Sequence, residues 1–204
     1  MFTGIITQLG KIVSITPLNK GLDVVIECNT SDLNCELGDS INVNGVCSTV
    51  TRFNETSFQV QYLEETLNKT TFSDMKIGDF VNLEASLSLQ TKLSGHFVSG
   101  HVDGIGQIDE LSLDEPWGKL VVRFSEDLAP YFIYKGSICI DGISLTVAEI
   151  IDNTFTCYII PHTIKETILQ YKSSGNYVNL ECDFIGKYVL RNIDLGKISL
   201  NGKK

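Results

Sequence analysis

The sequence predicts an all-β protein made of two tandem copies of one small barrel or sandwich. Two observations carry this prediction. Short runs rich in β-branched and aromatic residues follow one another, with Gly, Asn or Asp between them. A pattern of residues in the first half also returns about 97 positions later in the second half. Several short strands at regular spacing are typical of β-sandwiches and barrels.

Six runs in the first half have the composition and polarity of strands. Most alternate between apolar and polar residues, as strands with one buried face do. The runs are IITQLGKIVSI (5–15), LDVVIEC (22–28), SINVNG (40–45), STVTRF (48–53), SFQVQYL (57–63) and FVNLEA (80–85).

Helical signals are few. They fall at residues 65–75, 126–134 and 184–193. The last stretch is amphipathic, and it can either cap a core or contact another subunit. Its apolar face consists of Phe184, Ile185, Tyr188, Val189 and Ile193.

An internal repeat fixes the domain organisation. SINVNGVCSTV (40–50) aligns with SICIDGISLTV (137–147), and the same offset pairs the two VNLE segments at 81–84 and 178–181. The matches keep one order along the whole chain, which chance similarity does not do. We therefore expect two copies of one fold, roughly 90 residues each, joined near residue 95.

Composition and charge exclude several functional classes. Hydrophobic residues make up 43% and charged residues 20%, as in an ordinary globular protein, and the net charge is −9. Without basic clusters, neither nucleic acid nor an anionic membrane is expected as the main partner. The N-terminus lacks the pattern of a signal peptide, and no apolar run approaches the ~20 residues of a spanning helix. The six cysteines form no C-x-x-C pair, so we expect reduced thiols and a cytosolic protein.

The stretch LSGHFVSGHVDG (93–104) lies at the junction of the two copies and carries two of the three histidines. Five residues apart on an extended chain, His96 and His101 point to opposite faces and are poorly placed to share a metal ion. His162 has no neighbouring ligand in sequence, so no metal site is predicted. We interpret His96 as a structural, hydrogen-bonded histidine. His101 is the better functional candidate, because it replaces the apolar Ile5 of the first copy.

The same strand in each copy offers polar groups. Cys47 aligns with Ser144, and Thr49 aligns with Thr146. On a strand the two residues of each pair share one face, where they can donate hydrogen bonds to a planar heterocycle. The structural alternatives are a β-forming threonine and a cysteine buried as a small apolar residue.

Several segments together resemble the riboflavin synthase family over essentially the whole chain: MFTGI, NGVCSTV, GHFVSGHVDG, YKGSICIDGISLTV, and IIPHT followed by VNLECD. The resemblance implies two similar six-stranded Greek-key β-barrels with a C-terminal α-helix, assembled as a homotrimer. The implied domains are barrels at 1–95 and 96–184 and a trimerising helix and tail at 185–204. The implied reaction converts two 6,7-dimethyl-8-ribityllumazine molecules into riboflavin and 5-amino-6-ribitylaminouracil without a cofactor. In some bacteria such enzymes also associate with lumazine synthase.

The resemblance also implies where substrate binds, namely between the first barrel of one subunit and the second barrel of its neighbour. The first-barrel pocket is expected to include Gly4, Ile5, Ile6, Cys47, Ser48, Thr49, Gln61, Tyr62, Leu63, Glu64, Glu65 and Thr66. The second-barrel pocket is expected to include His101, Val102, Asp103, Lys135, Ser144, Leu145, Thr146, Ile159, Ile160, Pro161, His162, Thr163 and Ile164. Phe2 and Ser40 match further positions of the family.

Five residues match catalytic positions: His101, Ser144, Thr146, Cys47 and Asp183. His101 is the preferred proton-transfer residue, because a near-neutral imidazole suits reversible C–H chemistry. Ser144, Thr146 and Cys47 are hydrogen-bond donors or nucleophiles, and Asp183 assists them. Lys135 is either a counter-charge or a solvated turn lysine. Thiol, hydroxyl and water all stay open as the group that adds to the acceptor ring.

Two positions depart from the family pattern. Ser48 stands where leucine is commoner, and Ser94 replaces the first glycine of a usual GGH. These departures keep a second hypothesis in view: the related lumazine proteins of luminous bacteria bind the ligand as a fluorescent antenna without turnover. A flavin carrier or structural barrel ranks third. The five matched catalytic positions favour the enzyme.

Overall fold

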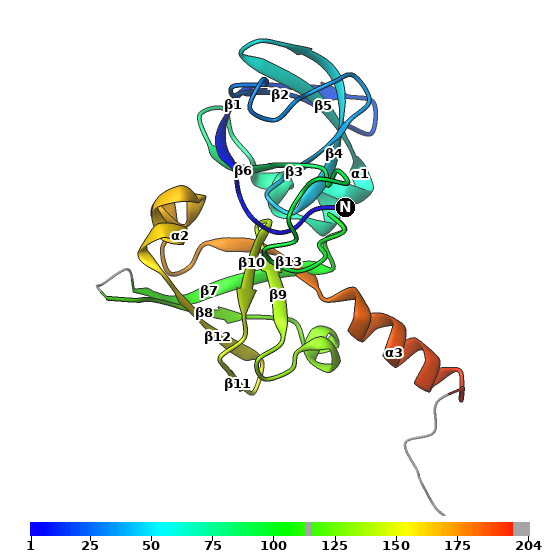
Figure 1. Ribbon diagram of the computed structural model, residues 1–204, viewed down its shortest axis with the longest axis vertical. Helices are drawn as coiled ribbons and strands as arrows, with labels where there is room; N and C mark the ends of the chain where they lie inside the picture. Colours follow the sequence, from blue (N-terminus) through cyan, green and yellow to red (C-terminus); the bar gives the residue numbers. More distant parts are fainter. Residues whose placement is uncertain (113–115, 198–204) are drawn as a thin grey trace, which may run out of the picture.

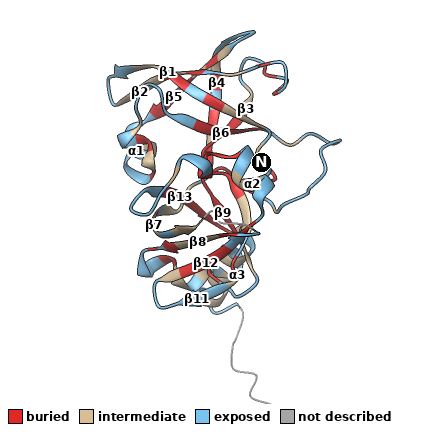
Figure 2. Ribbon diagram, turned by 90° about the vertical axis from the view of Figure 1, so that its left-hand side faces the viewer, coloured by how far each residue is buried: buried red, intermediate tan, exposed pale blue. Residues whose placement is uncertain are grey.

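The computed structural model of the chain describes residues 1–112 and 116–197. The two copies lie against each other, and a C-terminal helix, α3 (Phe184–Asp194), projects from the second copy (Figure 1). Most buried apolar residues form two cores, one inside each copy (Figure 2), and a third, small cluster consists of Phe2, Val98 and Cys139. The prediction of a mostly β protein built from a duplicated unit is confirmed.

The first copy is a closed barrel with strand order β1-β2-β5-β4-β3-β6. Its six strands correspond to the six predicted runs, and alternate residues along them point into the core. The strands are β1 (Gln8–Leu18), β2 (Gly21–Glu27), β3 (Ser40–Val43), β4 (Val46–Asn54), β5 (Ser57–Leu63) and β6 (Phe80–Ala85).

The second copy repeats this order but forms a seven-stranded sheet, β10-β9-β13-β7-β8-β12-β11, instead of the expected closed six-stranded barrel. The counterpart of β4 is divided into β10 and β11. The strands are β7 (Gly104–Ser112), β8 (Gly118–Arg123), β9 (Ser137–Ile140), β10 (Ile143–Thr146), β11 (Glu149–Ile151), β12 (Thr154–Ile159) and β13 (Tyr177–Cys182).

A β-bulge explains the division. In β4 the register shifts between Val50 and Arg52, and the hydroxyl of Thr51 donates to the carbonyl of Gln59 at 3.1 Å. At the equivalent bend of the second copy stands Ala148, which has no hydroxyl and donates only its backbone N–H to Thr156 at 2.7 Å. The same bend therefore interrupts the strand in the second copy.

In each copy short helices follow the same strand of the repeat, which is β5 in the first copy and β12 in the second. In the first copy α1 (Glu64–Lys69) and the 3₁₀ helix η1 (Thr71–Asp74) match the predicted helical stretch 65–75. The predicted stretch 126–134 is a 3₁₀ helix, η2 (Glu126–Tyr131), with Pro130 inside it. No helix in the described part of the chain is long and apolar enough to cross a membrane.

The second copy contains a helix that the sequence analysis missed, α2 (Pro161–Glu166), followed by η3 (Ile168–Tyr171). Its first residue is proline, which favours the first turn of a helix, and the repeat aligns it with α1. Both signals were present in the sequence.

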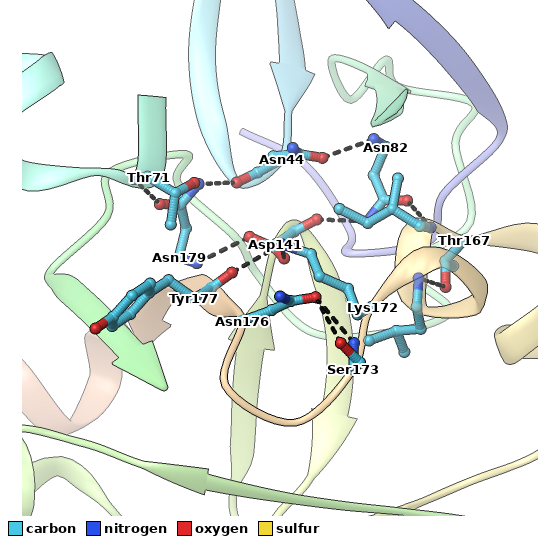
Figure 3. A network of polar contacts seen from close by, with 12 residues as sticks. Asn44, Thr71, Asn82, Asp141, Thr167, Lys172, Ser173, Asn176, Tyr177 and Asn179 are labelled. Carbon is cyan, nitrogen blue, oxygen red and sulfur yellow. Dashed lines mark hydrogen bonds and ion pairs between the residues drawn. The ribbon is translucent and has the colours of Figure 1, made fainter. Parts of the chain in front are cut away.

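Two buried asparagines join the copies (Figure 3). Nδ2 of Asn82 donates to the carbonyl of Asp141, and Nδ2 of Asn179 donates to the carbonyl of Asn44, each at 2.8 Å. Their Oδ1 atoms accept from the backbone N–H groups of Ile168 and Thr71, also at 2.8 Å. Each contact recurs with the two copies exchanged, as a two-fold axis between them requires.

The segment that precedes each barrel crosses to the other copy. We call residues 1–6 the first arm and residues 96–102 the second arm. The arms pair with each other where Phe2 N–H donates to Val98 O at 2.7 Å and Val98 N–H donates to Phe2 O at 3.1 Å. Ile6 packs against the core of the second copy, whereas Val102 packs against the core of the first. The domain boundaries at residues 95 and 184 stay a prediction.

Candidate functional site

Each arm docks through a glycine onto the strand that carries the predicted donors. The N–H of Cys47 donates to the carbonyl of Gly100, and the N–H of Ser144 donates to the carbonyl of Gly4, both at 2.8 Å. Both glycines have positive φ angles, +81° for Gly100 and +77° for Gly4. A Cβ on either would lie 2.6 Å from the Cβ of the facing Cys47 or Ser144. Only glycine permits this approach.

This docking corrects the expected grouping of the pocket residues. Gly4, Ile5 and Ile6 had been assigned to the first pocket, but the first arm lies against Ser144 of the second copy. His101 and Val102 had been assigned to the second pocket, but they lie beside Cys47 of the first. The repeat aligns the arms with their own barrels in sequence and carries no information that they exchange in space.

The first pocket is a cavity of ≈ 220 Å³ formed by β4, α1 and the second arm. The predicted residues Cys47, Glu65, Thr66, His101 and Val102 line it. The remaining lining residues are Val46, Lys69, Thr70 and Gly100. A half-buried thiol thus shares one cavity with an exposed imidazole.

At Ser144, where the second pocket is expected, the structure shows a side-chain pair that the sequence does not predict. We refer to this region as the second pocket. Nδ1 of His96 lies 2.7 Å from Oγ of Ser144 in a partly buried hydrogen bond. Burial lowers the pKa of His96 below its usual 6.5, and the nearby charge of Asp183 opposes this effect. A neutral imidazole hydrogen-bonded to a hydroxyl can act as its general base.

The expected hydrogen bond of His96 is present, and its partner is the predicted site residue Ser144. His96 has no counterpart in the first copy, because its aligned position falls before residue 1. The available signal was the repeated Gly-His dipeptide of the junction, Gly95-His96 and Gly100-His101. The two histidines serve different pockets.

Asp183 is held at the start of α3, where its Oδ1 accepts a hydrogen bond from the N–H of Ile185 at 2.9 Å. Its carboxylate is near enough to His96 to influence the imidazole. The Ser144 hydroxyl and the His96 imidazole are therefore in contact, and the Asp183 carboxylate acts on the imidazole electrostatically. In such an arrangement the imidazole can take the proton of the hydroxyl, which then acts as a nucleophile.

Several predicted binding residues have buried side chains. Oγ of Ser48 lies 2.9 Å from the hydroxyl of Tyr62 and donates to the carbonyl of Val46 at 3.0 Å. The buried side chains are those of Ser48, Tyr62 and Ile159 inside the barrels, and of Phe2 in the small cluster with Val98 and Cys139, against which Cys47 packs.

The other predicted residues are distributed around the two pockets. Asp103 accepts from the N–H of Cys182 at 2.8 Å and pairs with Lys187 of α3 at 2.6 Å, so it contributes to holding α3. Lys135 occupies an exposed turn with φ +63°. Ser40 pairs in register with Thr49 on the first barrel. Exposed residues of the set are Ile5, Thr49, Gln61, Leu63, Glu64, Thr146, Ile160, Pro161 and His162, and partly exposed ones are Leu145, Thr163 and Ile164.

Neither residue that departs from the family pattern lines the first cavity. The side chain of Ser48 belongs to the first core, and Ser94 is exposed. The constrained glycine of the segment is Gly95, where a Cβ would lie 2.2 Å from the carbonyl oxygen of Thr3 and 2.9 Å from Oγ of Ser144. A serine before it meets no such restriction.

Two further features concern other kinds of site. In residues 1–112 and 116–197 no group of three or more His, Cys, Asp or Glu side chains could hold a metal ion. A cavity of ≈ 350 Å³ lies where Phe80 of the first copy stacks on Tyr171 of the second, but it is lined by none of the predicted site residues.

Comparison with known proteins decides the family. Residues 3–86 and 99–183 each match the lumazine binding domain. The riboflavin synthase of Bacillus subtilis is 41% identical over 191 residues, covering 94% of this chain and 89% of the relative. The chain belongs to the riboflavin synthase family. The riboflavin synthase of Actinobacillus pleuropneumoniae is 44% identical over 93% of this chain and 88% of the relative.

Solved structures agree with this assignment. LumP complexed with riboflavin superposes with a TM-score of 0.84 at 26% identity, covering 90% of this chain and 100% of that one. LumP complexed with 6,7-dimethyl-8-(1'-D-ribityl) lumazine superposes with a TM-score of 0.82 at 25% identity, covering 90% and 99%. The duplicated fold is thus one that accommodates lumazine and flavin ligands in its relatives.

Proposed function

We propose that this protein is a riboflavin synthase, which converts two 6,7-dimethyl-8-ribityllumazine molecules into riboflavin and 5-amino-6-ribitylaminouracil. The similarity to riboflavin synthases of two bacteria over at least 93% of the chain supports this proposal. The observation that carries it is that the same strand of the repeat bears different reactive groups in the two copies: Cys47 lines a cavity with His101, and Ser144 is hydrogen-bonded to His96.

Two related but unequal pockets suit this reaction. The two substrates are identical, yet one donates a four-carbon unit and the other accepts it. Their atoms together equal those of the two products, so no oxidant or further reactant is needed. Holding both ring systems in contact removes several kcal/mol of the entropic barrier to a bimolecular step.

The residues of the site have proton-transfer roles. The substrate's 7-methyl group is acidic because the ring delocalises the resulting anion, so an imidazole can remove its proton. We assign this step to His101 in the first pocket. In the second pocket, His96 with Asp183 prepares the Ser144 hydroxyl to bind or add to a ring. Thiol, hydroxyl and water stay open as the group that adds.

We further propose that the active protein is a homotrimer in which the first barrel of one subunit faces the second barrel of the next. None of the residues of α3 is buried, and its exposed apolar side chains include Ile185, Tyr188 and Val189, at 58%, 68% and 45%. Such a face is expected to contact another subunit. We expect the trimer to act in the cytosol, and association with lumazine synthase is part of the same proposal.

Incubation of the purified protein with 6,7-dimethyl-8-ribityllumazine alone, in EDTA at neutral pH, tests the activity. Riboflavin is followed by absorbance, and the expected yield is half a mole per mole of lumazine consumed. Tight fluorescent binding without riboflavin would replace the proposal with the antenna function.

The role of His101 has a separate test. His101→Gln is expected to reduce kcat by about 10²- to 10⁴-fold and to remove one ionisation from the pH profile. Ser94→Gly, which changes an exposed residue to the family's usual one, is the matched control and should keep near-normal turnover. Full turnover of His101→Gln with an unchanged pH profile would exclude the assignment.

Assembly is tested by sedimentation equilibrium. Tyr188→Glu places a charge on the exposed face of α3 and should yield monomers that lack activity, because each site then lacks its facing barrel. A wild-type protein that sediments as a monomer and is active would contradict the trimeric arrangement.

A further inference from the structure

Two glutamates occupy positions where a carboxylate is costly. Glu84 on β6 and Glu181 on β13 end the repeated VNLE segments and are only 4% and 3% exposed. A buried carboxylate needs several hydrogen bonds to offset its lost hydration. Both glutamates receive most of these hydrogen bonds from one of the two arms.

Glu84 binds the first arm. Its Oε1 accepts from the N–H of Thr3 at 2.7 Å and from the Thr3 hydroxyl at 2.6 Å, and its Oε2 accepts from the N–H of Gly4 at 3.0 Å. A longer contact of 3.5 Å joins Oε2 to Nδ2 of Asn42 in its own barrel.

Glu181 binds the second arm in the same way. Its Oε1 accepts from the N–H and the hydroxyl of Ser99, both at 2.6 Å. Its Oε2 accepts from the N–H of Gly100 at 2.8 Å and from the N–H of His101 at 3.1 Å. The described hydrogen bonds of this carboxylate thus all come from the second arm.

The next contact of each arm lies in the opposite copy. Gly100 donates its N–H to Glu181 of the second copy and accepts from the N–H of Cys47 of the first. Gly4 donates to Glu84 of the first copy and accepts from the N–H of Ser144 of the second. One residue therefore connects the carboxylate of one barrel to the pocket strand of the other.

We propose that Glu84 and Glu181 are positioning residues that act crosswise: each belongs to one barrel and holds the arm that completes the substrate pocket of the other. Glu181 sets the place of His101 beside Cys47, and Glu84 sets the first arm against Ser144. This proposal rests on the proposed function for its catalytic consequence, but the positioning itself does not depend on turnover.

A merely structural role makes a different prediction. If each carboxylate only stabilises its own barrel, its loss affects its own copy's pocket or both pockets equally. The crosswise role predicts that changing Glu181 alters the first pocket, whereas changing Glu84 alters the second. The chain offers a reporter in each pocket, since His101 lies in the first and His96 in the second.

The experiment records the imidazole NMR signals of the protein labelled with ¹⁵N-histidine, without ligand and across a pH titration. In Glu181→Gln an amide NH₂ faces backbone donors, so the ring signals of His101 should change more than those of His96, which lies in the same arm but donates its N–H to the carbonyl of Thr3 in the first arm at 3.1 Å. In Glu84→Gln the ring signals of His96 should change more than those of His101. Three histidines make the spectrum easy to assign by single substitutions.

Milder variants keep the test decisive where a glutamine variant does not fold. Ser99→Ala removes one hydroxyl donor from Glu181, and Thr3→Val removes the matching donor from Glu84. The same crosswise pattern is expected with smaller shifts. Changes confined to the barrel that carries the altered glutamate, or equal changes at both histidines, would overturn the proposal.

Turnover provides the second readout. Each glutamine variant is expected to lower kcat by about tenfold or more and to change KM less, because a buried acceptor is lost from the group that sets pocket geometry. If the wild-type protein forms no riboflavin, the proposed function fails, while the crosswise histidine pattern still decides the positioning. The two failures are therefore distinguishable.

Discussion

At the contact between the two copies, the first has an asparagine and a methionine, Asn44 and Met75, where the second has Asp141 and Lys172. Nζ of Lys172 lies 3.3 Å from Oδ2 of Asp141, which is fully buried. The pockets differ likewise, with a thiol and His101 in one and a hydroxyl and His96 in the other. The two copies thus share the same arrangement of strands but differ in their polar side chains.

Where the two copies differ inside the barrels, two neighbouring residues differ together. Where the second core has Leu145 and Ile159, the first has Ser48 and Tyr62, whose hydroxyl groups bond to each other at 2.9 Å. A small residue makes room for a large one, and each polar group obtains a partner. Single substitutions that move one copy toward the other should therefore be harmful, whereas paired ones should be tolerated.

The largest effect is expected at the docking glycines. Gly100→Ala forces a Cβ to within 2.6 Å of the Cβ of Cys47 and 2.8 Å of its backbone nitrogen at φ +81°. Displacement of the second arm should reduce turnover more than about 100-fold and cost several kcal/mol, because backbone strain and a steric clash add. Thermal denaturation and kcat measure the two effects.

Gly38→Ala is the control for this prediction, since Gly38 has φ +87° but no atom within 4 Å of the new Cβ. It should lose only about 1–2 kcal/mol, the strain of the left-handed conformation. If both alanine variants lost the same stability and activity, the close approach of the arm would not be what requires Gly100.

The next largest effect concerns the buried ion pair. Lys172→Met gives the second copy the residue of the first and leaves the Asp141 carboxylate without its cation. We expect a loss of about 3–5 kcal/mol in the free energy of unfolding, measured by urea denaturation. The double variant Asp141→Asn/Lys172→Met restores the first copy's combination and should recover most of this loss. A double variant as unstable as the single one would refute the compensation.

A smaller effect is expected from His96 as pH falls. Because burial lowers its pKa in the folded protein below 6.5, the unfolded chain takes up a proton first. The stability contributed by the neutral imidazole is thus full above pH 6.5 and is lost as pH falls through the folded pKa. His96→Gln should show a shallower fall in Tm over this window, with the difference bounded at about 1.4 kcal/mol per pH unit.

His162→Gln, at an exposed histidine, is the control and should follow the wild-type curve. A wild-type curve parallel to that of His96→Gln would mean that the Ser144–His96 pair does not titrate in this range. Comparing the curves pairwise removes the contribution of carboxylates that titrate in all three proteins.

These comparisons also show what the sequence could predict. The six strands of the first barrel follow from alternating polarity, and the repeat places Cys47 opposite Ser144. The exchange of the arms could not be predicted, because it depends on Gly100 and Gly4 approaching the other copy, and an alignment is silent on contacts between copies. The hydrogen-bond partner of His96 could not be predicted for a related reason, since His96 has no counterpart in the first copy.

The smallest effect is expected inside the first core. Tyr62→Phe removes a hydroxyl from Ser48, whose own hydroxyl still donates to the Val46 carbonyl at 3.0 Å. The loss should be about 1 kcal/mol, the net value of one buried hydrogen bond, measured by urea denaturation. Ser48→Leu should cost more, because leucine and Tyr62 then compete for the same space, and Ser48→Leu/Tyr62→Ile should recover stability by copying the second core. Recovery with unchanged turnover would show that Ser48 serves packing alone, since its side chain points away from the first pocket. Loss of turnover in the double variant would instead mean that the geometry of the first pocket depends on the Ser48–Tyr62 pair.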